Sequence, residues 1–147
     1  MPVSNAAAPD LSDPTTDPFA VAEAAAQVVA DRSGADKHDI ALVLGSGWGE
    51  TADRIGETLV EIDNDDVPGF AKAAVAGHKG VMRSVRIGDT DRRALVFGTR
   101  THFYEGAGVD AVVHGVRTAA ATEARPSVER STRATSAPIR ASSTAHA

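Results

Sequence analysis

The sequence predicts an α/β fold, a mixed sheet flanked by helices. Three observations carry this prediction: a segment of helical period at residues 18 to 32, a short apolar run at 40 to 44 that leads into glycines, and an alternating run at 81 to 87 that is followed by a turn and a second run at 93 to 97. A chain of 147 residues is long enough to bury the core of one modest domain.

The first predicted helix has clear start and stop signals. Asp17 supplies a side-chain oxygen that can accept hydrogen bonds from the free amides of the first turn. Pro18 suits the first helical position because the N–H that proline lacks would have no partner within the helix. Gly34 is expected to end the helix after Arg32. One face of the helix, which we expect to cover a sheet, carries Val21, Ala24, Ala25, Val28 and Val29.

The remaining elements follow from hydrophobic period and turn residues. Residues 40 to 44 are expected to form a buried strand that leads to the functional site, and residues 58 to 62 form a second strand before a surface loop. Residues 81 to 87 and 93 to 97 are expected to pair as a β-hairpin. Residues 109 to 121 return to helical period, with Asp110 in the first turn, where a negative charge suits the helix dipole.

Composition excludes several classes of protein. The chain has no cysteine, which removes disulfides, thiolate nucleophiles and cysteine zinc sites. A net charge of −5 argues against broad nucleic-acid binding, because that affinity comes largely from lysine and arginine. No run approaches the roughly 20 apolar residues that cross a bilayer, and no basic stretch followed by an apolar run marks a secretory signal, so we expect a cytoplasmic protein without a membrane partner.

The two ends of the chain differ from its middle. Residues 1 to 17 contain three prolines among small and acidic residues and are predicted to be a disordered leader. Serine, threonine, alanine and arginine make up 19 of the 26 residues from 122 to 147, which therefore cannot build a core. We interpret this segment as a low-complexity, disordered tail; a second interpretation is that an unrelated reading frame has replaced the true continuation.

The glycine turn after the first predicted strand is a candidate anion site. In Gly45-Ser46-Gly47-Trp48-Gly49, backbone amides approach closely and Ser46 adds a hydroxyl, which suits phosphate. A tight structural turn is the plain alternative, and the glycine spacing is not that of a dinucleotide site.

Two later segments add donors of the same kind. His78 lies between glycines immediately before a strand, and Arg100 and His102 point the same way if their segment is extended. Glu105 lies three residues beyond His102 and is a candidate to orient its imidazole, or else to form a rim salt bridge. Together these residues predict a phosphate pocket. A metal site at His78, His102 and His114 is disfavoured because the histidines lack ligand-pair spacing.

At these residues the sequence resembles a known family, the trimeric purine nucleoside phosphorylases, which neighbour the methylthioadenosine phosphorylases. The resemblance covers about residues 19 to 121, roughly the first two fifths of a family chain. Four motifs carry it in order: residues 42 to 49, Val67-Pro68-Gly69-Phe70, Ala76-Gly77-His78-Lys79-Gly80, and Arg100-Thr101-His102-Phe103-Tyr104-Glu105-Gly106.

The resemblance implies a reaction and a set of roles. The reaction is phosphorolysis of a purine ribonucleoside or deoxyribonucleoside to the free base and a sugar 1-phosphate, with inorganic phosphate as co-substrate and no cofactor or metal. Tyr104 contacts the ribose, and His102 and Glu105 are the candidates for a supporting catalytic role. The implied phosphate-binding residues are Ser46, His78, Arg100, Thr101 and His102.

The resemblance stops after Ala121. In the family a strand, an Asn-Ala-Gly-Gly type loop and the residues that hold the purine follow such a helix, and none of these is found in residues 122 to 147. Residues 18 to 121 are therefore expected to be the N-terminal part of a phosphorylase domain, and the homotrimer of the family is not expected here. An inactive phosphate-binding fragment, a methylthioadenosine phosphorylase-type enzyme and a non-enzymatic interaction module stay open as alternatives.

Overall fold

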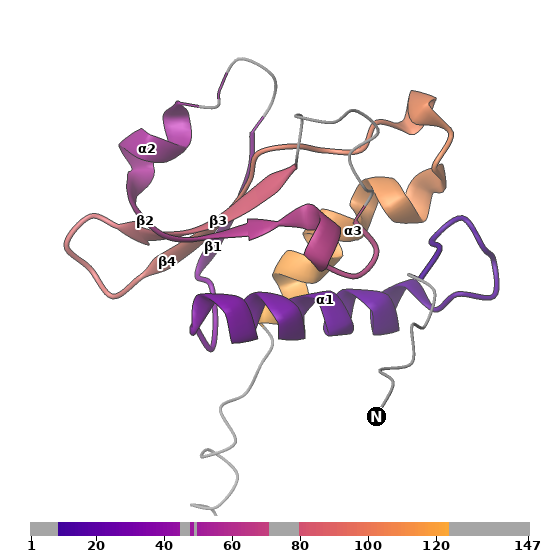
Figure 1. Cartoon of the computed structure of the whole chain (residues 1–147), viewed down its shortest axis with the longest axis horizontal. Coiled ribbons are helices and arrows are strands. Elements are labelled where there is room, and N and C mark those ends of the chain that lie inside the picture. Colours follow the sequence, from indigo (N-terminus) through magenta and orange to yellow (C-terminus); the bar gives the residue numbers. More distant parts are fainter. Residues whose placement is uncertain (1–8, 45–47, 49, 71–79, 124–147) are drawn as a thin grey trace, which may run out of the picture.

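The computed structural model describes residues 9–44, 48, 50–70 and 80–123. In these residues one mixed sheet has the strand order β1-β4-β3-β2, with β1 parallel to β4 and the other neighbours antiparallel (Figure 1). The strands are β1 (Ile40–Val43), β2 (Gly56–Asp63), β3 (Val81–Ile87) and β4 (Arg93–Phe97). The predicted α/β class and the predicted hairpin, formed by β3 and β4, are confirmed.

Helices cover both faces of this sheet. The long helices α1 (Pro18–Ser33) and α3 (Gly108–Glu123) lie on one side, and the short helix α2 (Thr51–Ile55) lies on the other (Figure 1). Two single 3-10 turns, η1 (Asn64–Asp66) and η2 (Phe103–Glu105), sit in the connections. Within the ranges described above, no helix is long and apolar enough to cross a membrane.

Helix α1 begins and ends where its sequence signals predict. The Asp17 side chain accepts hydrogen bonds from the amides of Phe19 (2.9 Å) and Ala20 (3.4 Å). Gly34 ends the helix with φ +63°, a left-handed conformation that glycine adopts without strain. One detail of its predicted face is wrong, because Ala24 is exposed. The helix packs on α3 as well as on the sheet, which turns a different set inward: Val21, Ala22, Ala25, Ala26, Val29 and Ser33.

The sheet separates two apolar clusters. The larger one lies between the sheet and the α1/α3 layer, and the smaller one lies under α2. Leu95 and Phe97 of β4 face the first cluster, while Ala94 and Val96 face the second, as strand alternation requires. Strand β4 is therefore the centre of the described sheet, with its last four residues, Ala94–Phe97, no more than 2% exposed.

The predicted burial of the first strand is wrong. Strand β1 forms where expected, but Ile40 and Val43 are 45% and 47% exposed. The physical reason is its position: in the described part of the chain β1 pairs with β4 along one side and has no strand along the other.

Other boundaries shift modestly. Strand β2 is longer than the predicted 58 to 62, and α3 extends the predicted 109 to 121 at both ends. Helix α2 was not predicted; it has five residues and no side-chain cap hydrogen bond, so its sequence signal is weak. Residues 11 to 16 form turns, and Leu11 among them is buried. Thr122 and Glu123 belong to α3. For the rest of the two predicted disordered segments, residues 1 to 8 and 124 to 147, which lie outside the described residues, disorder stays a prediction.

Candidate functional site

The parallel pair β1 and β4 brings two motif segments to one end of the sheet. The Leu44 amide, just after β1, donates to the carbonyl of Phe97, the last residue of β4 (3.0 Å). The glycine turn follows Leu44, and the segment with Arg100 follows Phe97. Ligands of α/β proteins commonly bind beyond the carboxyl ends of parallel strands. The candidate Ser46 itself lies outside the described residues.

Asn64 joins a third segment to the same end of the sheet. Its backbone amide donates to the Gly80 carbonyl (2.9 Å), and its side-chain Nδ2 donates to Thr99 Oγ1 (3.2 Å). The Gly98 amide donates to the Val81 carbonyl (3.1 Å), so the residues just after β4 are also bonded to the first residue of β3. We call the hydrogen-bonded set of Asn64, Gly80 and Thr99 the Asn64 clasp. It holds the start of β3 beside the segment that leads to Arg100.

The clasp explains a glycine of the third motif. A Cβ at Gly80 would lie 2.7 Å from both Asn64 Nδ2 and Thr99 Oγ1, which is closer than side-chain carbons come to other atoms. Glycine allows the approach because it has no Cβ. The candidate His78, two residues earlier, lies outside the described residues.

Sequence reasoning missed Asn64 and Thr99. Asn64 follows an acidic strand end and precedes Pro68, so its surroundings suggested a surface loop, yet only 6% of it is exposed. Its side-chain partner is 35 residues away, and no local pattern signals such a contact.

The segment after β4 presents the other predicted site residues. Arg100, Tyr104 and Glu105 are exposed, whereas Thr101 and His102 are half-buried. His102 is extended, at φ −98° and ψ 144°, as the predicted common direction of Arg100 and His102 requires. Within the described part of the chain Arg100 forms no ion pair, so its guanidinium is available to an anion.

Turn η2 fixes the imidazole of His102. The His102 carbonyl accepts from the Glu105 amide (3.0 Å), and Gly106, at φ +78°, ends the turn. The His102 ring then stacks on the Tyr104 ring, with centroids 4.9 Å apart and planes 11° apart. Glu105 thus contacts His102 through this backbone hydrogen bond, and Glu105 also lines a pocket.

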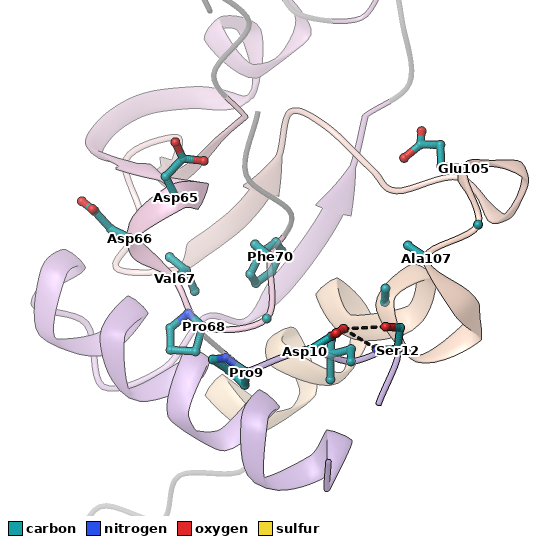
Figure 2. Close-up of a pocket in the computed structure, with 14 residues that line it drawn as sticks. Pro9, Asp10, Ser12, Asp65, Asp66, Val67, Pro68, Phe70, Glu105 and Ala107 are labelled. Atoms are coloured by element: carbon teal, nitrogen blue, oxygen red, sulfur yellow. Dashed lines mark hydrogen bonds between the residues drawn. The ribbon is translucent and has the colours of Figure 1, made fainter. Parts of the chain in front are cut away.

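That pocket, of about 660 Å³, lies between the N-terminal segment, the loop after η1 and the start of α3 (Figure 2). Four acidic residues are among those that line it, Asp10, Asp65, Asp66 and Glu105, and the Asp66 carboxylate pairs with Arg32 (3.2 Å). Hydrogen bonds from Ser12, through its hydroxyl and its amide, lower the pKa of Asp10 and keep it charged. None of the described residues that are predicted to bind phosphate, Arg100, Thr101 and His102, lines this pocket, so it is not the predicted anion site, although it is larger than the cavity described next.

A smaller cavity of about 230 Å³ lies at the carboxyl ends of β1 and β4. Leu44 and Thr99, which lead to the glycine turn and to Arg100, both line it. Its charged group is Arg83, which pairs with Glu61 (2.9 Å) and Asp53 (3.3 Å). This cavity therefore lies next to the segments that are predicted to bind phosphate, and Arg100 follows its lining residue Thr99.

His114 of α3 holds the loop of the second motif. Its Nε2 lies 2.8 Å from the Pro68 carbonyl, and its ring packs against Phe70 with centroids 4.7 Å apart. The ring is 1% exposed, and burial lowers the pKa of its imidazole. A neutral ring with one nitrogen committed to a carbonyl is a packing residue, and nowhere among the residues with described positions do three metal-ligating side chains gather.

The fold of the described residues is that of solved nucleoside phosphorylases. Isoform 2 of purine nucleoside phosphorylase from Schistosoma mansoni, solved with cytosine and ribose-1-phosphate, matches 71% of this chain and 35% of its own, with a TM-score of 0.60 and 27% identity. A second purine nucleoside phosphorylase, solved with ribose-1-phosphate, matches with the same TM-score at 24% identity, which shows the fold alone.

Sequence relatives narrow the class to one family. The purine nucleoside phosphorylase of a Cellulomonas species is 58% identical over 119 residues, which are 79% of this chain and 42% of that protein. The enzyme of that name from Mycobacterium tuberculosis strain H37Rv is 44% identical over 115 residues, again 42% of its length. No family model matches the sequence. Over about four fifths of its length this chain is therefore homologous to purine nucleoside phosphorylases, and it spans about two fifths of the length of these curated relatives.

Proposed function

We propose that this chain forms the phosphate- and ribose-binding part of a purine nucleoside phosphorylase. The observation that supports it best is topological. Strands β1 and β4 and the Asn64 clasp bring the ends of three motif segments to the same end of the sheet, at the carboxyl ends of β1 and β4. Tyr104 is assigned to the ribose. The residues assigned to phosphate are Ser46, His78, Arg100, Thr101 and His102.

The proposed reaction is attack by phosphate on the anomeric carbon of a purine nucleoside. A phosphate oxygen forms the new C–O bond, the C–N glycosidic bond breaks, and its electron pair leaves with the purine. Arg100 offers a planar two-pronged donor to the dianion, and the stacked imidazole of His102 offers one further contact. The held dianion lies next to the positive charge that develops on the sugar and stabilises it.

The departing purine gains negative charge, and stabilising it is a separate task. The resemblance assigns that task to residues that follow in the family and have no counterpart in residues 122 to 147. We therefore expect phosphate binding without appreciable phosphorolysis by the 147-residue chain, since uniform binding of phosphate lowers no barrier selectively. Action on purine nucleosides, assembly as a homotrimer and a cytoplasmic location are proposed only for a full-length enzyme of this kind.

Calorimetric titration with inorganic phosphate tests the assignment. Arg100→Ala is expected to weaken binding by about tenfold or more, because it removes a charged two-pronged contact. His78→Ala removes a single contact and should cost only about threefold to tenfold. Arg92→Ala is the matched control: Arg92 is exposed in the β3–β4 turn and should leave phosphate affinity unchanged.

Two results would contradict the proposal. Equal losses for the Arg100 and Arg92 variants would mean that phosphate is attracted by general charge only. Turnover of inosine by the unmodified chain at about 1 per second or faster would show that the purine-binding residues are not required.

A further inference from the structure

Asn64 is a buried polar residue in an otherwise charged turn. The next two residues, Asp65 and Asp66, are exposed, whereas Asn64 is buried. Burying a carboxamide costs free energy unless its groups are hydrogen-bonded. Among the described residues Asn64 Oδ1 has no hydrogen-bond partner, and Nδ2 donates to Thr99 Oγ1. The bond to Thr99 is therefore what an asparagine contributes here that an apolar side chain could not.

The backbone under Asn64 is held firmly. Its amide donates to the Gly80 carbonyl (2.9 Å), and its carbonyl accepts from the Val67 amide (3.0 Å). Ile62 and Val67, on either side of turn η1, both belong to the larger apolar cluster, so the turn is attached to the core at both ends. A side chain on such a backbone is a rigid support for whatever it contacts.

Thr99 is the last anchored residue before Arg100. Backbone hydrogen bonds first hold Phe97 beside β1 and Gly98 beside β3. The side chain of Thr99 is then held by Asn64. Along the part of the chain with described positions, no further hydrogen bond precedes Arg100. The direction in which the chain enters Arg100 therefore depends on the contact between Asn64 and Thr99.

This dependence matters because Arg100 has little else to orient it. The residue is exposed, and within the described ranges its guanidinium forms no ion pair. A two-pronged contact with an anion requires a defined direction of the guanidinium plane. A segment that is already fixed loses less conformational freedom when the anion binds, which raises the affinity.

We propose that Asn64 is a positioning residue of the phosphate site, which acts through Thr99 to fix the segment that carries Arg100. Asn64 itself does not touch phosphate in this proposal. The proposal rests on the phosphate-binding role of Arg100 proposed above, and it adds a residue that lies 36 positions earlier in the chain and outside all four motifs.

Calorimetric titration of the full 147-residue chain with inorganic phosphate is the first measurement. Asn64→Ala removes the donor, and Thr99→Val removes the acceptor while keeping the shape of the side chain. Each variant should bind phosphate about threefold to tenfold more weakly. Thr99→Ser keeps the oxygen and should restore binding to within about twofold of the unmodified chain. If Asn64→Ala does not fold, Thr99→Val at its exposed position still tests the contact.

The double variant separates positioning from direct binding. If Asn64 acts through Thr99, the combination of Asn64→Ala and Thr99→Val should weaken binding no more than the stronger single change. Ser84→Ala is the matched control, because it also removes a buried side-chain hydrogen bond, the one between Ser84 Oγ and His38 Nε2 (2.9 Å). It should leave phosphate affinity unchanged.

A second measurement needs no phosphate. The backbone order parameter of the Arg100 amide, from nuclear magnetic resonance, should be above about 0.8 in the unmodified chain and fall below about 0.6 in Asn64→Ala and Thr99→Val. The Ser84→Ala control should keep the high value. This measurement tests the positioning of the segment separately from the proposed function.

Three results overturn the proposal. The first is unchanged phosphate affinity in Asn64→Ala or Thr99→Val when Arg100→Ala weakens binding. The second is a double variant whose loss is the product of the two single losses, because Thr99 would then contact phosphate independently of Asn64. The third is an Arg100 order parameter that is equal in all variants. Unchanged affinity in Arg100→Ala would refute the proposed function itself, whatever the order parameters show, and remove the anion that the positioning serves.

Discussion

Strands β1 and β4 are parallel neighbours of similar composition, but their burial is opposite. In β4 the residues Ala94–Phe97 are at most 2% exposed, whereas Ile40 and Val43 of β1 are nearly half exposed. Strand β4 has a neighbour on each side and an apolar cluster on each face, while β1 has β4 alone in the described ranges. An aliphatic run therefore indicates a strand, but its neighbours decide how much stability it contributes.

The sharpest test of this contrast compares two leucines. Leu95→Ala in β4 removes a fully buried side chain and should lower the free energy of unfolding by about 3–4 kcal/mol. Leu42→Ala in β1 removes a half-buried one and should cost about 1 kcal/mol. Denaturant titration of both variants measures the difference. Equal losses would show that β1 is as well supported as β4.

Acid should lower the free energy of unfolding through His38, which precedes β1. The Nε2 of His38 lies 2.9 Å from Ser84 Oγ of β3. Burial, and to a lesser extent the Arg93 guanidinium, lowers the pKa of the His38 imidazole to about 4. The unfolded chain, with an ordinary histidine, binds more protons between pH 6.5 and 4. Stability is therefore complete above this range and falls as the pH decreases through it, by about 2 kcal/mol between pH 7 and pH 5.

Urea titrations at pH 7 and pH 5 measure that loss. His38→Gln keeps a hydrogen-bonding side chain without a titrating ring and should remove the part of the difference between the two pH values that His38 contributes. His114→Gln is the comparison, because the pKa of His114 is also lowered by burial but the ring contacts the Pro68 loop and not β3. An unchanged pH dependence in the His38 variant would refute the assignment.

The smallest expected effect concerns the helix that covers the well-packed side. Asp17→Ala removes the cap of α1 and should cost about 1 kcal/mol, measured as a lower midpoint in thermal unfolding. Asp36→Ala, at an exposed position just after the same helix, controls for the lost charge and should change stability by less than about 0.5 kcal/mol. A loss as large as that of Leu95→Ala would mean that α1 depends on its cap more than on packing.

Features set by neighbouring residues could be predicted from the sequence, and features set by distant contacts could not. Asp17, Pro18 and Gly34 mark α1 because caps act within one turn. The exposure of β1 follows from its having β4 as its single neighbouring strand among the described residues, and the Asn64 clasp depends on Thr99, 35 residues later. Neither leaves a local pattern.

The candidate site shows the same division. The motif segments indicated Arg100 and His102 as anion-binding residues, and the described segment is consistent with their common direction. The sequence did not reveal which acidic residues line the larger pocket, because Asp10, Asp65, Asp66 and Glu105 come from three separated segments. Charge that gathers from distant parts of a chain becomes visible only when the fold is known.

The alanines on the buried face of α1 have a thermodynamic consequence. Half of the residues that this helix buries are alanines, which remove little apolar surface from water when the chain folds. The heat capacity change of unfolding scales with the apolar surface that becomes exposed, and so does the dependence of stability on denaturant. The stability of this chain should therefore vary gently with temperature and denaturant, with broad transitions in place of the steep ones that a leucine-rich interface of the same length produces.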